Sequence, residues 1–402
     1  MSRNGLSISR RALITSTGGM VLGYLLGCRS NPDDSQLDQF IASTLKGSQT
    51  PGIAACVVKE DEVIWSGGYG WADIAARKRM TPDTLLNIAS ISKTVTATAI
   101  MQLWEEKKFG LDDDIGDYLS FSVRNPRYAD TPITFRQLLT HSSSINDGPS
   151  YISGYACGDP TVRLMDWLYS YFDLSGENYD AKENFHPWEP GSSDVPEAVD
   201  PYSNLGFGLL GGLVESISDM AFAKYCKERI FEPLGMKNTA WYIDDIDKSQ
   251  HAIPYSAASG PRFLTISGDD DTNPADDSDY YEHCLYSFPN YPDGGIRTSV
   301  NQLSRFLRAY IGQGEHNANR ILRASTVRSM LSHEHFGRGL CWSEIELQDG
   351  NSAWGHSGGD PGVSTYMGFN SKDNRGVIVF ANYDGDDRVG RIAERLIRHG
   401  QS

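Results

Sequence analysis

The chain has 402 residues, 39% of them hydrophobic, which is enough to bury a large core and to form two or three domains. Its formal charge of -16, from 36 Lys and Arg against 52 Asp and Glu, argues against nucleic acid or an anionic membrane surface as a partner. No apolar span of about 20 residues follows the N-terminal segment, and the sequence has no internal repeat.

The N-terminal segment, residues 1–28, predicts an export signal with a lipobox. Arg10 and Arg11 precede an apolar stretch over residues 13–26, a pattern that resembles a twin-arginine signal. Leu25-Leu26-Gly27-Cys28 resembles a bacterial lipobox, in which the cysteine is lipidated and becomes the mature N-terminus. We therefore expect a periplasmic protein of the bacterial cell envelope, held at the membrane by a lipid anchor only, and at the outer membrane if the cell is Gram-negative. The alternative is a plain signal or a short membrane anchor.

Periodicity and turn signals predict an α/β domain with a mostly helical insertion. A linker over 29–35 leads into the α/β domain, which takes up 36–109 and 291–402, and the insertion domain takes up 110–290. In the α/β domain we expect helices over 36–46, 90–107, 301–311 and 388–398, and strands over 52–58, 62–68, 339–347, 363–370 and 376–382. Helical patterns in the insertion cover 133–140, 162–172 and 205–216. The first and last helices are expected to pack together against the sheet.

Five cysteines follow Cys28, and their spacing matches no zinc or redox motif. In an oxidising periplasm we expect one bridged pair, and Cys157 with Cys284 is the candidate because both lie in loop-like segments. Cys56 and Cys341 lie in strand-like runs and are interpreted as small buried hydrophobic residues.

The chain carries a Ser-x-x-Lys pattern twice, at Ser43 with Lys46 and at Ser90 with Lys93. Residues three apart lie on one face of a helix, so the lysine amine can reach the serine hydroxyl and activate it as a nucleophile. Ser43 lies where its predicted helix ends. Ser90 is expected to begin a helix, where the dipole and unpaired amides stabilise negative charge. We therefore predict Ser90 as the nucleophile and Lys93 as its partner.

A second group, Tyr202-Ser203-Asn204, precedes an apolar helical pattern, so its side chains are expected to emerge at a helix start. A tyrosine held near a lysine cation can have its pKa of about 10 lowered and act as base or acid. The alternative for Tyr202 is a buried tyrosine that only forms a hydrogen bond. His141, at the end of a helical pattern, is interpreted as structural.

A third group carries His356 followed by Ser357, Gly358 and Gly359. Small residues after the histidine allow a substrate to approach the backbone, so we assign His356, Ser357 and Gly358 to substrate binding. The amides of Gly359 and Ser90 are predicted to form an oxyanion hole. The same run satisfies the Gly-x-Ser-x-Gly nucleophile elbow, which would make Ser357 the nucleophile, although no helical pattern follows it.

Taken in order, these motifs resemble the serine β-lactamase-like superfamily, specifically its branch of class C β-lactamases, D-alanyl-D-alanine carboxypeptidases and family VIII esterases. Ser90 and Lys93 match the Ser-x-x-Lys motif of that family. Its Tyr-x-Asn motif matches Tyr202 and Asn204, and its Lys or His-x-Gly motif matches His356 and Gly358. Smaller similarities lie at 138–142, 190–191, 231–236 and 293–296. The resemblance covers most of the chain, from about residue 35 to residue 398.

The resemblance implies a β-lactamase/transpeptidase-like α/β fold, with an antiparallel sheet flanked by the N- and C-terminal helices and a mostly helical insertion domain. It also implies acyl transfer through a covalent ester on Ser90. Lys93, which burial and nearby donors are expected to keep partly neutral, and Tyr202 together take the serine proton. Asn204 orients the substrate and Lys93. No metal and no organic cofactor are expected.

The expected substrate class depends on one position at which this sequence differs from class C β-lactamases. His356 stands where class C β-lactamases usually carry lysine, so a β-lactam specialist is not favoured, and the expected target is an ester, amide or D-amino-acid peptide bond in a small-molecule or peptidoglycan-like substrate. Two other interpretations stay open. One is a non-catalytic penicillin-recognising envelope lipoprotein, and the other is an α/β-hydrolase esterase using Ser357.

Overall fold

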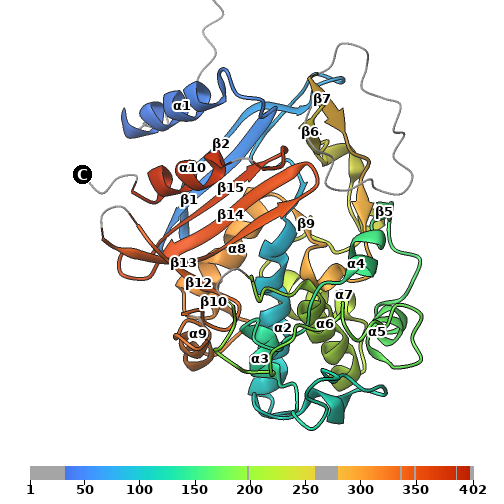
Figure 1. Ribbon diagram of the computed structural model, residues 1–402. Helices are drawn as coiled ribbons and strands as arrows, with labels where there is room; N and C mark the ends of the chain where they lie inside the picture. The colour runs from blue at the N-terminus through green and yellow to red at the C-terminus, as the bar shows by residue number, and fades with distance from the viewer. Residues whose placement is uncertain are drawn as a thin grey trace, which may run out of the picture.

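A computed structural model (Figure 1) describes residues 32–196, 199–258, 279–335, 337–347, 350–385 and 387–398. The predicted export signal and Cys28 lie outside the described residues. Lipidation and localisation therefore stay predictions, as do the domain boundaries.

A seven-stranded sheet is assembled from segments near the two ends of the chain. Its strand order is β12-β13-β14-β15-β1-β2-β3, and every neighbouring pair is antiparallel. The two halves meet where β1 pairs with β15, with Ile53 opposite Ala381. The strands are β1 (Gly52–Lys59), β2 (Glu62–Asp73), β3 (Lys78–Arg79), β12 (Ser343–Glu346), β13 (Ser352–Asp360), β14 (Val363–Asn370) and β15 (Arg375–Ala381).

Alternate side chains of β1 belong to two separate cores, as the two-residue repeat of a strand requires. Ile53 and Val57 pack with the terminal helices α1 (Pro32–Leu45) and α10 (Arg388–Ile397), which lie on one face of the sheet (Figure 1). Ala54, Cys56 and Val58 belong to the larger core on the other face. The expected packing of the first and last helices against the sheet is thus confirmed.

The remaining elements supply the larger core and the site. The helices are α2 (Ser92–Glu105), α3 (Phe135–Leu139), α4 (Pro149–Ser153), α5 (Leu164–Phe172), α6 (Asn204–Ser218), α7 (Phe222–Cys226), α8 (Val300–Ile311) and α9 (Ala324–Met330). The described residues also form four short strand pairs: β4 (Leu86–Asn87) with β9 (Arg297–Thr298), β5 (Ala156–Cys157) with β8 (Tyr286–Ser287), β6 (Tyr255–Ala257) with β7 (Tyr280–Glu282), and β10 (Glu315–His316) with β11 (Asn319–Arg320).

The cysteine predictions agree with the structure. Cys157 and Cys284 form a disulfide beside the pairing of β5 with β8, which confirms the predicted bridge. Cys56 and Cys341 are buried free thiols, as expected.

Strand β13 differs from the prediction, which places no strand over residues 352–360. Three glycines and several polar residues give this segment neither alternation nor β-branched content. Its conformation is determined by its neighbours, because it is hydrogen-bonded between β12 and β14. The expected strand over 339–347 is also shorter and covers only Ser343–Glu346.

No single helix among the described residues is long and apolar enough to cross a membrane. Helix α6 and the segment Phe222–Phe231 reach the necessary length and composition only as a pair, across an 81° bend.

Candidate active site

Ser90 lies in a tight turn that leads into α2. The 3-10 turn Ala89–Ile91 runs directly into the helix at Ser92, so Ser90 precedes the first α-helical residue. Ala89 has a φ of 47°, in the left-handed region that residues other than glycine rarely adopt. The Asn87 side chain accepts a hydrogen bond from the Ala89 amide at 2.8 Å and holds this turn. Such strain is typical of a turn that presents a functional side chain.

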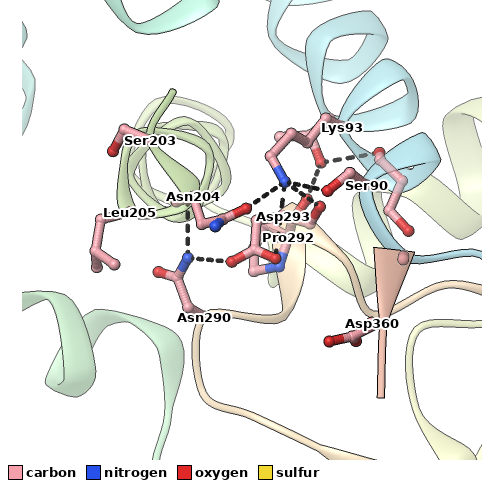
Figure 2. Close-up of polar contacts among 12 residues, drawn as sticks. Ser90, Lys93, Ser203, Asn204, Leu205, Asn290, Pro292, Asp293 and Asp360 are labelled. Atoms are coloured by element: carbon pink, nitrogen blue, oxygen red, sulfur yellow. Dashed lines mark hydrogen bonds and ion pairs between the residues drawn. The ribbon is translucent and has the colours of Figure 1, made fainter. Parts of the chain in front are cut away.

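The Lys93 amine is buried and points at Ser90 (Figure 2). Its Nζ donates to Ser90 Oγ at 3.0 Å, to Asn204 Oδ1 at 2.6 Å and to the Asp293 carbonyl at 2.9 Å. Asp293 Oδ1 lies 4.0 Å from the same Nζ. Three acceptors match the three hydrogens of an ammonium group.

The charge of Lys93 differs from the expectation. Burial lowers the pKa of Lys93, but the nearby Tyr202 and the Asp293 and Asp147 carboxylates act against it, and the pKa lies above its ordinary value. The prediction that burial keeps Lys93 partly neutral is therefore wrong. Burial and nearby donors were expected to lower the pKa, but Tyr202 and two carboxylates far from Lys93 in the sequence raise it.

Tyr202 faces Lys93 and Ser90 at the start of α6. The Lys93 Nζ lies 5.0 Å from the centre of the Tyr202 ring. Burial raises the pKa of Tyr202 while the Lys93 charge lowers it, and the pKa stays above its ordinary value. The phenol oxygen is buried, and contact with the Lys93 and Ser90 side chains lowers its pKa against the effect of burial. The phenol therefore lies beside both the nucleophile and its amine.

His141 packs on Tyr202, with ring centres 4.1 Å apart. Its Nδ1 accepts a hydrogen bond from the Ser203 amide at 3.1 Å. Burial lowers the pKa of His141 well below its ordinary value, so the ring is neutral. This position allows His141 to orient Tyr202.

Asn204 is held by Asp147, a residue that the sequence argument missed. The Asp147 carboxylate accepts from the Asn204 amide at 2.9 Å, from Asn204 Nδ2 at 2.7 Å and from the Leu205 amide at 2.9 Å. These bonds satisfy amides at the start of α6, which Ser203 caps by accepting from the Gly206 amide at 3.1 Å. They also fix the Asn204 side chain so that its oxygen faces Lys93. In the sequence, Asp147 before Gly148 reads only as a turn.

Strand β13 lies against the turn that carries Ser90 because residue 358 is glycine. A Cβ at Gly358 would lie 2.5 Å from the Ile88 carbonyl oxygen and 2.3 Å from Thr365 Oγ1. Thr365 Oγ1 itself donates to the Ile88 carbonyl at 2.9 Å. At Gly359, in contrast, a Cβ would meet nothing within 4 Å. Gly358 therefore packs closely against the turn that carries Ser90, whereas Gly359 faces open space.

His356 is a buried residue of β13, and Ser357, which follows it, is exposed. His356 Nδ1 donates to the Ser357 carbonyl at 2.6 Å. Burial and then the Lys93 charge lower the pKa of His356 to about 4, so the ring is neutral at neutral pH. Ser357 is exposed inside a strand that turns directly into β14. The helix that a nucleophile elbow requires after its serine is therefore missing.

A pocket of about 360 Å³ opens over this arrangement. It is lined by Ser90, Tyr202, His356, Ser357 and Gly359, together with His141, Asp200, Arg338, Cys341, Ser343, Ile345 and Gly355. Lys93, Asn204 and Gly358 do not line it and act from behind its wall. The second Ser-x-x-Lys is elsewhere: Ser43 is exposed on α1 and donates to the Phe40 carbonyl at 2.8 Å. Nowhere in the described ranges do three or more His, Cys, Asp or Glu side chains form a group that could hold a metal ion.

Comparison with solved structures supports the fold. The D-amino acid amidase from Ochrobactrum anthropi SV3 complexed with D-phenylalanine superposes with a TM-score of 0.71 at 21% identity, covering 91% of this chain and 99% of that chain. The D-alanine carboxypeptidase AmpC from Burkholderia cenocepacia gives a TM-score of 0.64 at 21% identity, covering 91% and 98%. At these identities the likeness establishes the β-lactamase/transpeptidase-like fold.

Comparison of sequences establishes the family. Protein flp of Staphylococcus aureus (strain N315) is 26% identical over 378 residues, which are 91% of this chain. The match spans 66% of that relative's length, just under two thirds. The family model described as Beta-lactamase matches residues 37–402. The chain therefore belongs to the Beta-lactamase family.

Proposed function

We propose that this protein is a serine hydrolase that forms an acyl-enzyme on Ser90. The observation that carries the proposal is the 3.0 Å hydrogen bond between Lys93 Nζ and Ser90 Oγ. The remaining Lys93 donors are fixed by Asn204 and by the Asp293 carbonyl, so the ammonium is held in place at the nucleophile. Family membership supports the same chemistry.

The charges of Lys93 and Tyr202 support a role for each residue in moving the proton of Ser90. At rest Lys93 is charged and Tyr202 is neutral, so the pair must lose one proton before it can accept the proton of Ser90. After that loss, the Lys93 charge stabilises a Tyr202 phenolate, which takes the proton as Ser90 Oγ attacks the carbonyl carbon. Tyr202 then returns the proton to the leaving group. The rate of acylation should therefore rise with pH.

The oxyanion of the tetrahedral intermediate is assigned to the amides of Ser90 and Gly359. Both residues line the pocket, and Gly358 brings their segments together. Each donor in such a site contributes roughly 3 kcal/mol when measured by removal. Water then attacks the ester and releases the second product.

The charges of the pocket favour a neutral acyl donor. His356 is neutral, and among the described lining residues Arg338 is the sole permanent cation. Its guanidinium lies 3.9 Å from Asp200, which offsets its charge. We therefore propose an ester, an amide or a D-amino-acid peptide bond as the target. The names of the two solved structures, a D-amino acid amidase and a D-alanine carboxypeptidase, support the amide and peptide targets.

We propose the periplasmic side of a bacterial envelope as the location, with a lipid anchor at Cys28. The Cys157–Cys284 disulfide supports an oxidising compartment. Replacement of Cys28 by alanine should block lipid-dependent maturation. Normal processing of that variant, or insensitivity of the wild type to globomycin, would exclude the anchor.

The hydrolase proposal is tested by a turnover panel on the form that lacks residues 1–28. Short-chain p-nitrophenyl esters, D-phenylalanine amide, a D-Ala-D-Ala peptide and nitrocefin cover the substrate classes. We expect Ser90→Ala to abolish turnover and Ser357→Ala to retain it. The reverse result would establish the elbow mechanism. An intact protein that turns over nothing and takes up no acylating probe would be the non-catalytic lipoprotein instead.

A further inference from the structure

A second buried network begins at Lys93 and runs away from Ser90. The Asp293 carboxylate, 2% exposed, has one oxygen 4.0 Å from Lys93 Nζ. Its other oxygen accepts from Asn290 Nδ2 at 2.6 Å and from the Tyr151 hydroxyl at 3.1 Å. Figure 2 shows Asp293 between the lysine amine and Asn290. The mechanism above uses the Asp293 carbonyl but not this carboxylate.

The network continues from Tyr151 to the far side of the site. The Tyr151 and Tyr155 hydroxyls are 3.4 Å apart, and Tyr155 donates to Asp360 at 3.1 Å. Asp360 is the last residue of β13 and directly follows the proposed oxyanion residue Gly359. Asn87 donates to the same carboxylate at 3.3 Å and also holds the turn before Ser90. The chain of contacts thus leads from Lys93 back to the nucleophile's own turn.

We propose that Asp293 is a positioning residue that controls the charge of Lys93 and thereby the pH at which Ser90 becomes competent for acylation. This inference rests on the proposed hydrolase function. Asp293 touches neither Ser90 nor the pocket and acts through Lys93.

The direction of the effect follows from the charges. Burial raises the pKa of Asp293 to about 7, although Lys93 lowers it, so the carboxylate ionises near neutral pH. The ionised carboxylate stabilises the Lys93 ammonium and opposes a second anion at Tyr202. Both effects make the Lys93 and Tyr202 pair keep its proton to higher pH. Without the carboxylate, the pair should lose that proton at lower pH.

Other titratable groups surround this centre and must be considered with it. The elements packed around Asp293 contribute Lys93 of α2, Asp147 before α4, Tyr151 of α4, Tyr155 after α4 and Asp360 of β13. Tyr202 and His356 lie on the other side of Lys93. Asp293 is the carboxylate with an ion-pair contact to Lys93 within the described chain, so its removal has the largest expected effect.

The test is the pH profile of kcat/KM for a p-nitrophenyl ester, together with the rate at which a fluorophosphonate labels Ser90, from pH 6 to pH 12, because the pKa values of Lys93 and Tyr202 both lie above their ordinary values. In Asp293→Asn the midpoint of the rising limb should move to lower pH by about one unit. Tyr151→Phe removes a donor to the carboxylate and should shift the midpoint in the same direction by less. Asp114→Asn is the control, because it removes a hydrogen-bonded carboxylate that pairs with Arg124 instead. Its midpoint should match the wild type.

An unchanged midpoint in Asp293→Asn, or a shift to higher pH, would overturn the inference even if the rate falls, because a merely structural role lowers the rate without moving the limb. If Asp293→Asn does not fold, Tyr151→Phe decides by the same criterion. Failure of the underlying function looks different: the wild type itself would then show neither turnover nor labelling of Ser90.

Discussion

Replacing Asp147 by alanine should lower both the free energy of unfolding of the protein and its kcat. The carboxylate satisfies the backbone amides of Asn204 and Leu205 at the start of α6 and orients the Asn204 side chain. An unsatisfied buried donor costs about 1–3 kcal/mol, and loss of a helix cap costs roughly 1 kcal/mol. Burial raises the pKa of Asp147, so desolvation of the carboxylate offsets part of this stabilisation. We therefore expect a loss of about 2–3 kcal/mol.

The catalytic loss has a separate cause. Without Asp147, Asn204 is free to rotate, and the 2.6 Å contact that orients Lys93 is lost. Misplacement of a catalytic group by about 1 Å can reduce a rate by about two orders of magnitude, so kcat should fall by roughly 10- to 100-fold.

Urea unfolding and steady-state ester hydrolysis measure these effects. Asp180→Ala is the matched control, because Asp180 also accepts from two backbone amides, those of Lys182 and Glu183, but in an exposed turn. It should lose at most about 1 kcal/mol, with kcat unchanged. If Asp147→Ala is no less stable than Asp180→Ala and equally active, Asp147 does not hold the site as described.

Three further predictions concern packing, the disulfide and pH. Gly358→Ala should lower the melting temperature because its Cβ would lie 2.5 Å from a backbone carbonyl oxygen. Gly359→Ala should leave the melting temperature unchanged, because a Cβ there meets nothing within 4 Å. Equal melting temperatures of the two variants would contradict this packing. Replacing both Cys157 and Cys284 by serine opens a 127-residue link and should cost roughly 3–5 kcal/mol in urea unfolding, and a loss under about 1 kcal/mol would show that the bridge does not matter for stability. Asp293 has a raised folded-state pKa of about 7, so its contribution to stability is fully present below about pH 4 and is lost as the pH rises to about 7. Relative to Asp293→Asn, the wild type should therefore lose up to roughly 4 kcal/mol of unfolding free energy over that interval. A difference between the two proteins that does not change with pH would contradict the raised pKa.

The predictable features were those encoded within a few residues. Ser90 and Lys93 lie one helical turn apart, and the apolar pattern after Ser203 marks the start of α6. The strands with continuous apolar runs, such as Gly52–Lys59, were also predictable, because side chains buried on both faces leave a clear pattern.

The unpredictable features depend on residues that are far apart in the chain. Asp293 reaches Lys93 across 200 residues, and no local pattern marks either Asp293 or Asp147 as a neighbour of the lysine. For the same reason the direction of the Lys93 pKa shift could not be deduced from burial alone. Strand β13 also lacks a local signal, because its conformation comes from pairing with β12 and β14.

The central claim is that Ser90 is the nucleophile, and the most direct measurement is the site of covalent labelling. The protein without residues 1–28 is treated with a fluorophosphonate. Its intact mass is then measured, and the labelled residue is identified by peptide mass spectrometry. One label should be found on Ser90; it should be absent in Ser90→Ala, kept in Ser357→Ala, and formed much more slowly in Lys93→Met. A label on Ser357, or labelling of Ser90→Ala at the wild-type rate, would contradict the account.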